Sequence, residues 1–117
     1  MQFKFPKNDH KYFWTNHSKQ KLLQYNLTPN LVKRVIRNIE RKEVGIAPDT
    51  IAVMRRKNRK DPKKGEIWVM YQKFGSKLKI ISAWIYPGET KKGKEIFVPD
   101  EVWVELEKGQ IDNKIQN

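Results

Sequence analysis

The chain has 117 residues, enough for one domain, and its 38% hydrophobic residues supply an ordinary small core and argue against wholesale disorder. It carries 25 Lys and Arg against 13 Asp and Glu, a net charge of +12, so an anionic partner is expected to offset the self-repulsion. It has no Cys and no apolar run of about 20 residues, which excludes a disulfide scaffold, a thiol enzyme and a transmembrane helix.

The N-terminal part of the chain predicts an arm, a short strand and a helix. Residues 1–11 form the arm, which is too polar for a signal peptide, and we expect a cytoplasmic protein without a membrane partner. Residues 12–15 have the composition of a short strand. Asn16 or Ser18 then serves as the N-cap of a helix that runs to about Tyr25.

A second helix is predicted from Thr28, a capping residue followed by a proline at the first helical position. Its apolar residues recur at helical spacing and are Leu31, Val32, Val35, Ile36 and Ile39. Gly45 lies just past its expected end. A basic stripe with a spacing of four residues lies on another face and consists of Lys33, Arg37 and Arg41.

Extended segments follow. Residues 50–57, 66–74 and 77–86 are rich in β-forming residues, and Gly75-Ser76 is a two-residue hairpin signal between the last two. If that turn sets the register, one face of the hairpin carries Tyr71, Ser82, Trp84 and Tyr86. Both faces are apolar near the middle of the hairpin, so each needs a cover or is a working surface.

The charge is divided unevenly along the chain. Residues 95–117 hold six acids against two lysines, a net charge of −4, and their pattern fits a short helix or a strand. We expect an α+β fold with two N-terminal helices on a three- to four-stranded antiparallel sheet. We expect the domain to span residues 12–94. Residues 95–117 form an acidic C-terminal extension, and its acidic residues 95–107 would fold over the basic sheet.

The densest positive stretch lies in residues 55–64. Charge runs are often merely solvated, but this one is flanked by apolar strands that would hold it in place against a polyanion. We assign its cations to phosphate contacts, which add affinity without sequence choice: Arg55, Lys57, Arg59, Lys60, Lys63 and Lys64. The helical stripe is a second, weaker candidate.

The element order, with His17-Ser18 opening the first helix, resembles the small ribonuclease toxins of the barnase–EndoU–colicin–RelE group. The strand 80–86 is similar to that of the BrnT-like branch, in which the last strands end in Ser or Thr followed by an aromatic residue. The matching residues are Ser82, Trp84 and Tyr86. A basic residue on the first long strand also matches, at Arg55 or Arg56. The resemblance covers residues 12–87, and it departs where Trp84 stands in place of an Arg.

This resemblance implies a toxin that cleaves RNA without a metal or cofactor, silenced by an antitoxin protein. His17 would transfer protons, because its pKa lies near working pH. Phosphate contacts would come from Arg56, Tyr71, Ser82 and Tyr86, and Trp84 would stack a base. The structural alternatives stay open: His17 bonded to backbone at a helix start, Tyr71 and Trp84 in the core, and Ser82 as a tolerated small residue.

Two other functions compete. A non-catalytic RNA-binding module fits the charge and the aromatic residues equally well. A metal-dependent nuclease is suggested by Asp49 and by Asp61-Pro62-Lys63, which match a bare PD…DxK pattern. Because Pro62 would interrupt the strand that this pattern needs, we interpret that match as accidental.

Overall fold

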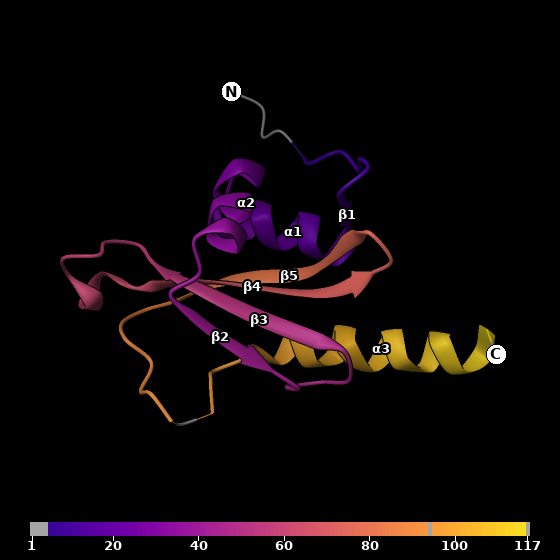
Figure 1. Cartoon of the computed structure of the whole chain (residues 1–117). Coiled ribbons are helices and arrows are strands. Elements are labelled where there is room, and N and C mark those ends of the chain that lie inside the picture. Colours follow the sequence, from indigo (N-terminus) through magenta and orange to yellow (C-terminus); the bar gives the residue numbers. More distant parts are fainter. Residues whose placement is uncertain (1–4, 94, 117) are drawn as a thin grey trace.

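The structure, a computed structural model, describes residues 5–93 and 95–116, with side chains described for 5–93 and 95–108. This part of the chain is an α+β fold in three layers (Figure 1). Helices α1 (Asn16–Tyr25) and α2 (Pro29–Arg37) cover one face of the sheet, and α3 (Asp100–Gln116) lies across the other. The expected α+β class is confirmed, and the second sheet face is covered by the C-terminal segment.

The described strands form one five-stranded mixed sheet in the order β1-β5-β4-β3-β2. The expectation of a three- to four-stranded antiparallel sheet is wrong in two respects: β1 pairs with β5 in parallel, and an additional strand, β2, forms the opposite edge. The strands are β1 (Tyr12–Trp14), β2 (Arg41–Val44), β3 (Thr50–Arg56), β4 (Glu66–Phe74) and β5 (Lys77–Tyr86).

Threonine side chains start both N-terminal helices. Thr28 caps α2 as predicted, with Pro29 at the first turn. The cap of α1 is Thr15, not Asn16 or Ser18: its Oγ1 accepts a hydrogen bond from the backbone N–H of Ser18 at 3.0 Å. The same hydroxyl lies 3.1 Å from the carbonyl oxygens of Ile80 and Ile81, which fixes the start of α1 against β5.

The second helix is shorter than predicted. It ends at Arg37 with Asn38 as its C-cap, and the next residues form β2. Strand β2 pairs with β3 in an antiparallel hairpin whose turn contains Gly45 and Asp49, both with positive φ. The helical pattern of apolar residues continues to Ile39 and therefore predicts too long a helix, because a turn after Arg37 brings Arg41 into the sheet.

A β-bulge between Met70 and Tyr71 divides the β4–β5 hairpin. Tyr71 lies in the core under α1 and α2, whereas Met70 lies in the core under α3 and is paired with Ser82. The predicted face that combined Tyr71 with Ser82 and Trp84 is therefore wrong. A single extra residue in β5 moves Tyr71 to the opposite side.

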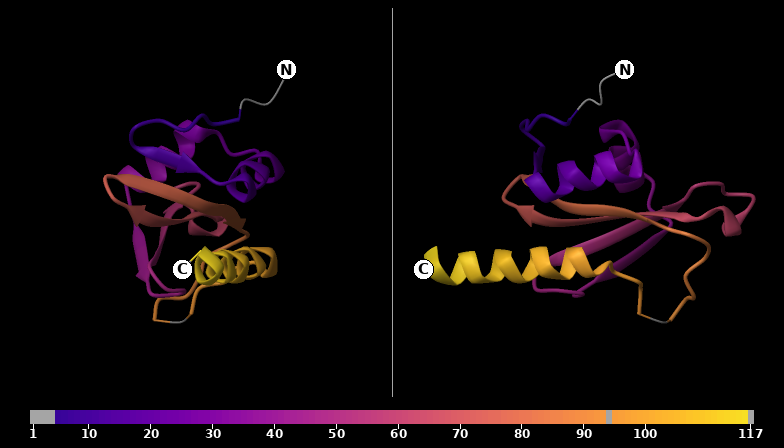
Figure 2. Two further views of the ribbon diagram at one scale, coloured as in Figure 1. Left: turned by 90° about the vertical axis from the view of Figure 1, so that its right-hand side faces the viewer. Right: turned by 180° about the vertical axis from the view of Figure 1, so that it is seen from behind.

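The acidic segment from residue 95 onward packs onto an apolar sheet face. Val98, Val102 and Leu106 are buried against Trp68 and Trp84, whose rings stack at 6.2 Å between centroids. Of the two alternatives for this segment, the helix is the one observed. The acidic segment thus folds over the sheet, as considered from the sequence, but the face that it covers is apolar, and Figure 2 shows α3 extending away from the basic β3–β4 loop.

Candidate functional site

The basic run occupies the β3–β4 loop, which projects from one end of the sheet (Figure 1). Asp61 caps the short 3-10 helix Pro62–Lys64 by accepting a hydrogen bond from the backbone N–H of Lys63 at 3.1 Å. Arg59 has a carboxylate at 3.7 Å, that of Glu40. The exposed cations of the loop are Lys57, Arg59, Lys60, Lys63 and Lys64. Positive charge therefore dominates this projection, as a phosphate-binding surface requires.

His17 and Ser82 are brought together, as the proposed proton-transfer site needs. Strand β1 pairs only with Leu78 to Ile80 of β5. The start of α1 contacts β5 just after these residues. Because Thr15 anchors the first turn of α1 to β5, His17 Nε2 lies 3.1 Å from Ser82 Oγ. Ser82 is fully buried and His17 is half-buried. The pair is thus in hydrogen-bond contact, with only the imidazole accessible.

The cavity beside His17 has a volume of about 410 Å³ and lies between α1 and α3. It is lined by Asn16, His17, Gln20, Glu101, Val104, Glu105 and Lys108. Burial lowers the pKa of His17 below its ordinary 6.5, an effect that the carboxylate of Glu105 opposes. The ring is therefore neutral at pH 7 and able to accept a proton. Two carboxylates and one lysine nevertheless make this cavity a poor place for a phosphate.

The other predicted site residues are dispersed. Tyr71 is 6% exposed and Trp84 is fully buried beneath α3, so the core alternative is favoured for both. Burial raises the pKa of the Tyr71 hydroxyl, which makes it a weaker acid than a free tyrosine. Tyr86 is half-buried, with its ring 5.9 Å from that of Phe97.

Arg56 lies far from the His17–Ser82 pair. It is in register with Glu66 of β4 and, through Glu66, with Tyr86 of β5. Ser82 is four positions earlier on β5, about 13 Å along the strand at 3.3 Å per residue. The basic loop and the imidazole therefore do not converge on one patch, which was the arrangement expected of a nuclease.

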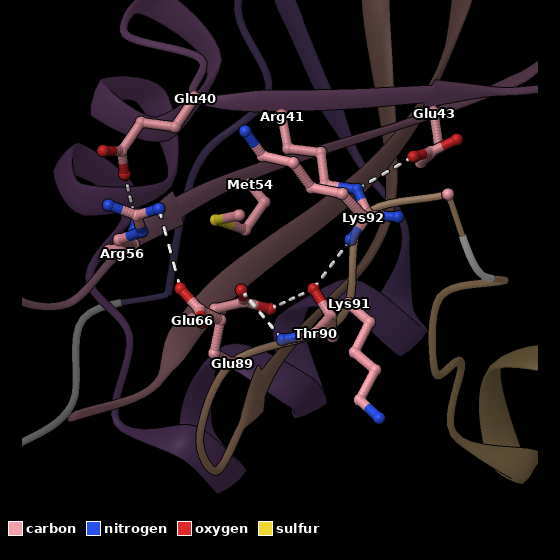
Figure 3. Close-up of a pocket in the computed structure, with 11 residues that line it drawn as sticks. Glu40, Arg41, Glu43, Met54, Arg56, Glu66, Glu89, Thr90, Lys91 and Lys92 are labelled. Carbon is pink, nitrogen blue, oxygen red and sulfur yellow. Dashed lines mark hydrogen bonds and ion pairs between the residues drawn. The ribbon is translucent and has the colours of Figure 1, made fainter. Parts of the chain in front are cut away.

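A second cavity, of about 670 Å³, opens beside Arg56 (Figure 3). It lies between β2, β3, the start of β4 and the loop 89–93, with Met54 and Gly93 also in its lining. Equal numbers of cations and carboxylates line it: Arg41, Arg56, Lys91 and Lys92, and Glu40, Glu43, Glu66 and Glu89. Unlike the loop beside it, this cavity presents both donors and acceptors.

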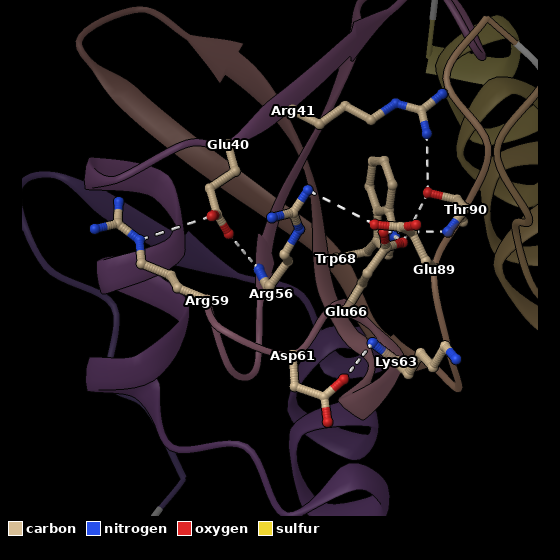
Figure 4. A network of polar contacts seen from close by, with 10 residues as sticks. All are labelled: Glu40, Arg41, Arg56, Arg59, Asp61, Lys63, Glu66, Trp68, Glu89 and Thr90. Atoms are coloured by element: carbon tan, nitrogen blue, oxygen red, sulfur yellow. Dashed lines mark hydrogen bonds and ion pairs between the residues drawn. The ribbon is translucent and has the colours of Figure 1, made fainter.

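A buried carboxylate holds one wall of this cavity in place (Figure 4). Glu66 is 1% exposed and accepts hydrogen bonds from Trp68 Nε1 at 3.0 Å and from Thr90 Oγ1 at 2.8 Å. The backbone N–H of Thr90 donates to its other oxygen at 3.2 Å. Arg41 Nη1 in turn donates to Thr90 Oγ1 at 2.8 Å. The network fixes the loop 89–93 against the sheet.

Sequence reasoning missed this cavity, although one signal for it was present. Glu66 is a charged residue in phase with Trp68 and Met70 on an otherwise apolar face of β4. Such a residue is buried only if it has partners, so it points to a polar network. The partner Thr90 lies in a loop that carries no pattern of its own.

The predicted helical stripe is not a single surface. Lys33 lies over the ring of Tyr12, with Nζ 5.1 Å from the centroid, and Arg37 is exposed at the last residue of α2. Arg41 belongs to β2, where its Nε pairs with Glu43 at 2.8 Å. The stripe fails because the helix stops before Arg41.

Three further observations bear on function. Among the side chains that the structure describes, in residues 5–93 and 95–108, no group of three or more His, Cys, Asp and Glu is placed to hold a metal ion. Asp49 and Asp61 lie beyond opposite ends of β3 and cannot share one ion. No helix in the same residues is long and apolar enough to cross a membrane. Comparisons with family models, curated proteins and solved structures give no match.

Proposed function

We propose that this protein is a basic RNA-binding module that holds the RNA backbone with its β3–β4 loop. The observation that carries this proposal is the projection of five exposed cations with a single acid, Asp61, whose carboxylate caps the adjoining turn. Exposed lysine and arginine side chains bind phosphates and release counterions from the nucleic acid. RNA, rather than DNA, is proposed because of the resemblance of the chain to ribonuclease toxins.

The test measures binding of a labelled single-stranded RNA by fluorescence anisotropy over a range of salt concentrations. Replacing Lys63 and Lys64 by Gln should weaken binding and reduce the slope of log K against log[salt] by about 1.4, or 0.7 for each lost contact. The matched control is Lys73→Gln, which removes an exposed lysine at the far end of β4. A DNA of the same sequence tests the choice of RNA.

The proposal fails if the RNA does not bind at low salt. It also fails if the control variant weakens binding as much per lysine removed as the loop variant does, because the contact would then be diffuse attraction to a positive protein. Equal affinity for the DNA would retain the loop as the binding surface but remove the preference for RNA.

A metal-free ribonuclease is the second candidate, and the contact between His17 Nε2 and Ser82 Oγ favours it. A neutral imidazole at the mouth of a cavity is a competent base for a 2′-hydroxyl. The weakness of this candidate is the distance from the cavity to Arg56 and the two carboxylates that line it.

The cleavage assay uses single-stranded RNA in EDTA, so that activity dependent on a metal is excluded. His17→Ala should abolish cleavage, whereas His10→Ala, which alters the exposed second histidine, should leave it unchanged. If the His17→Ala variant still cleaves RNA, His17 is not the base. If the protein cleaves no RNA, free or on ribosomes, the RNA-binding module is the one proposal that remains.

A further inference from the structure

Arg56 lines a charged cavity, and its guanidinium makes no hydrogen bond to any of the residues that the structure describes. Its side chain is 32% exposed, and its closest carboxylate oxygen, on Glu89, lies 3.7 Å from Nη2, beyond hydrogen-bond range. Its Nε is buried and has no partner among the described residues. Most buried donors in folded proteins are satisfied, so a buried Nε–H without an acceptor in the wall of a cavity indicates that the acceptor comes from outside the chain.

The ligand that fits is not a phosphate. Three carboxylates surround Arg56, because Glu40 accepts from its backbone N–H, Glu66 is beside it in register and Glu89 faces its Nη2. A phosphate beside Arg56 would be repelled by these three carboxylates, although the cavity as a whole is lined by as many cations as acids. A neutral carbonyl oxygen satisfies Arg56 without that repulsion, and an N–H group beside the carbonyl can donate to Glu89, which is 51% exposed.

The cavity also lies at the base of the proposed RNA-binding loop. The backbone N–H of Lys57 donates to the carbonyl of Gly65 at 3.0 Å, which closes the loop immediately before Glu66. Lys91 and Lys92 are exposed on the other rim. Phosphates held by the loop thus place neighbouring bases within reach of Arg56, and a flexible single strand can turn one of them inward.

We propose that this cavity binds one unstacked base of the RNA and selects bases with a lactam unit, a ring carbonyl next to a ring N–H. Guanine and uracil have this unit, whereas adenine and cytosine do not. Arg56 donates to the carbonyl oxygen and Glu89 accepts from the ring N–H. This inference rests on the proposed RNA binding and adds base selection to it.

The experiment compares four labelled RNAs that are identical oligoadenylates except for one central position, which is A, C, G or U. The G and U oligomers should bind the protein tighter than the A and C oligomers, by on the order of tenfold for a well-formed pair of contacts. Arg56→Lys keeps the charge but loses the planar fork, and it should flatten this ratio. Glu89→Ala, at an exposed position, removes the acceptor and should also flatten this ratio.

The control is Lys63→Gln, which should weaken all four complexes by the same factor and leave their ratio unchanged. If all four RNAs bind the native protein equally, the base-selection inference is overturned while the RNA-binding proposal stands. If none of them binds, the RNA-binding proposal fails as well. A glutamate-rich peptide that displaces RNA from the native protein but not from Arg56→Lys would show that the cavity takes an acidic protein segment instead.

Discussion

The packing of α3 on the sheet can be tested with two identical substitutions on one helix. Val102 is fully buried against the second core, whereas Val104, two residues later, is 51% exposed. Val102→Ala removes two buried methyl groups at about 0.8 kcal/mol each and leaves a small cavity. Alanine regains about 0.5 kcal/mol of helix propensity, so the net loss of unfolding free energy is about 1.5 to 2.5 kcal/mol.

Val104→Ala has the same propensity gain with little lost burial, and its stability should be unchanged or up to about 0.5 kcal/mol higher. Urea denaturation, followed by the fluorescence of the four tryptophans, of which Trp68 and Trp84 lie beneath α3, measures both variants. The midpoint should fall for Val102→Ala at an unchanged m-value. Equal midpoints for the two variants would show that α3 does not pack on this sheet face, and the three-layer fold would be refuted.

Two further predictions concern buried polar groups. Glu66→Gln turns one acceptor of the Thr90 network into a donor and should lower the unfolding free energy, measured in urea, by about 2 kcal/mol. The control is the exposed Glu89→Gln. Equal losses of stability for the two variants would contradict the network. Because burial lowers the pKa of His17, the unfolded chain binds its proton more readily, and stability should fall as the pH drops below the ordinary value of 6.5. His17→Gln should make the urea midpoint less dependent on pH between about pH 7.5 and pH 5. An unchanged dependence would show that the half-buried imidazole is not its source.

Local signals in the sequence were sufficient for most of the elements. The strands at residues 66–74 and 77–86 coincide with β4 and β5, because alternation and a Gly-Ser turn are both local. Strand β2 was missed because four residues carry too little alternation to outweigh a helical pattern that continues into them. Residues 41–44 form a strand because they pair with β3, and that pairing exists only in the folded chain.

The candidate site depended on features that no local pattern reports. The bulge at Met70/Tyr71 moved Tyr71 to the other face, and the helix at Asp100–Gln116 converted Trp84 from a candidate base platform into a core residue. The contact between His17 and Ser82 was anticipated, because both were assigned to one site. The position of Arg56 relative to that contact could not be predicted from the sequence, because it follows from the register of three strands.

The proposed binding of an external polyanion requires that the acidic residues of α3 leave the basic loop free. The sheet contacts of α3 are apolar, through Val102 and Leu106, and its acidic residue Glu101 forms an ion pair with Lys21 of α1 at 2.7 Å. Figure 1 shows the β3–β4 loop and the C-terminal end of α3 at opposite ends of the molecule. Among the described residues, no ion pair joins an acid of α3 to a cation of the loop, and charges separated by more than about 8 Å are largely screened at physiological ionic strength. The loop therefore keeps its positive potential in the free protein, ready for a phosphate backbone.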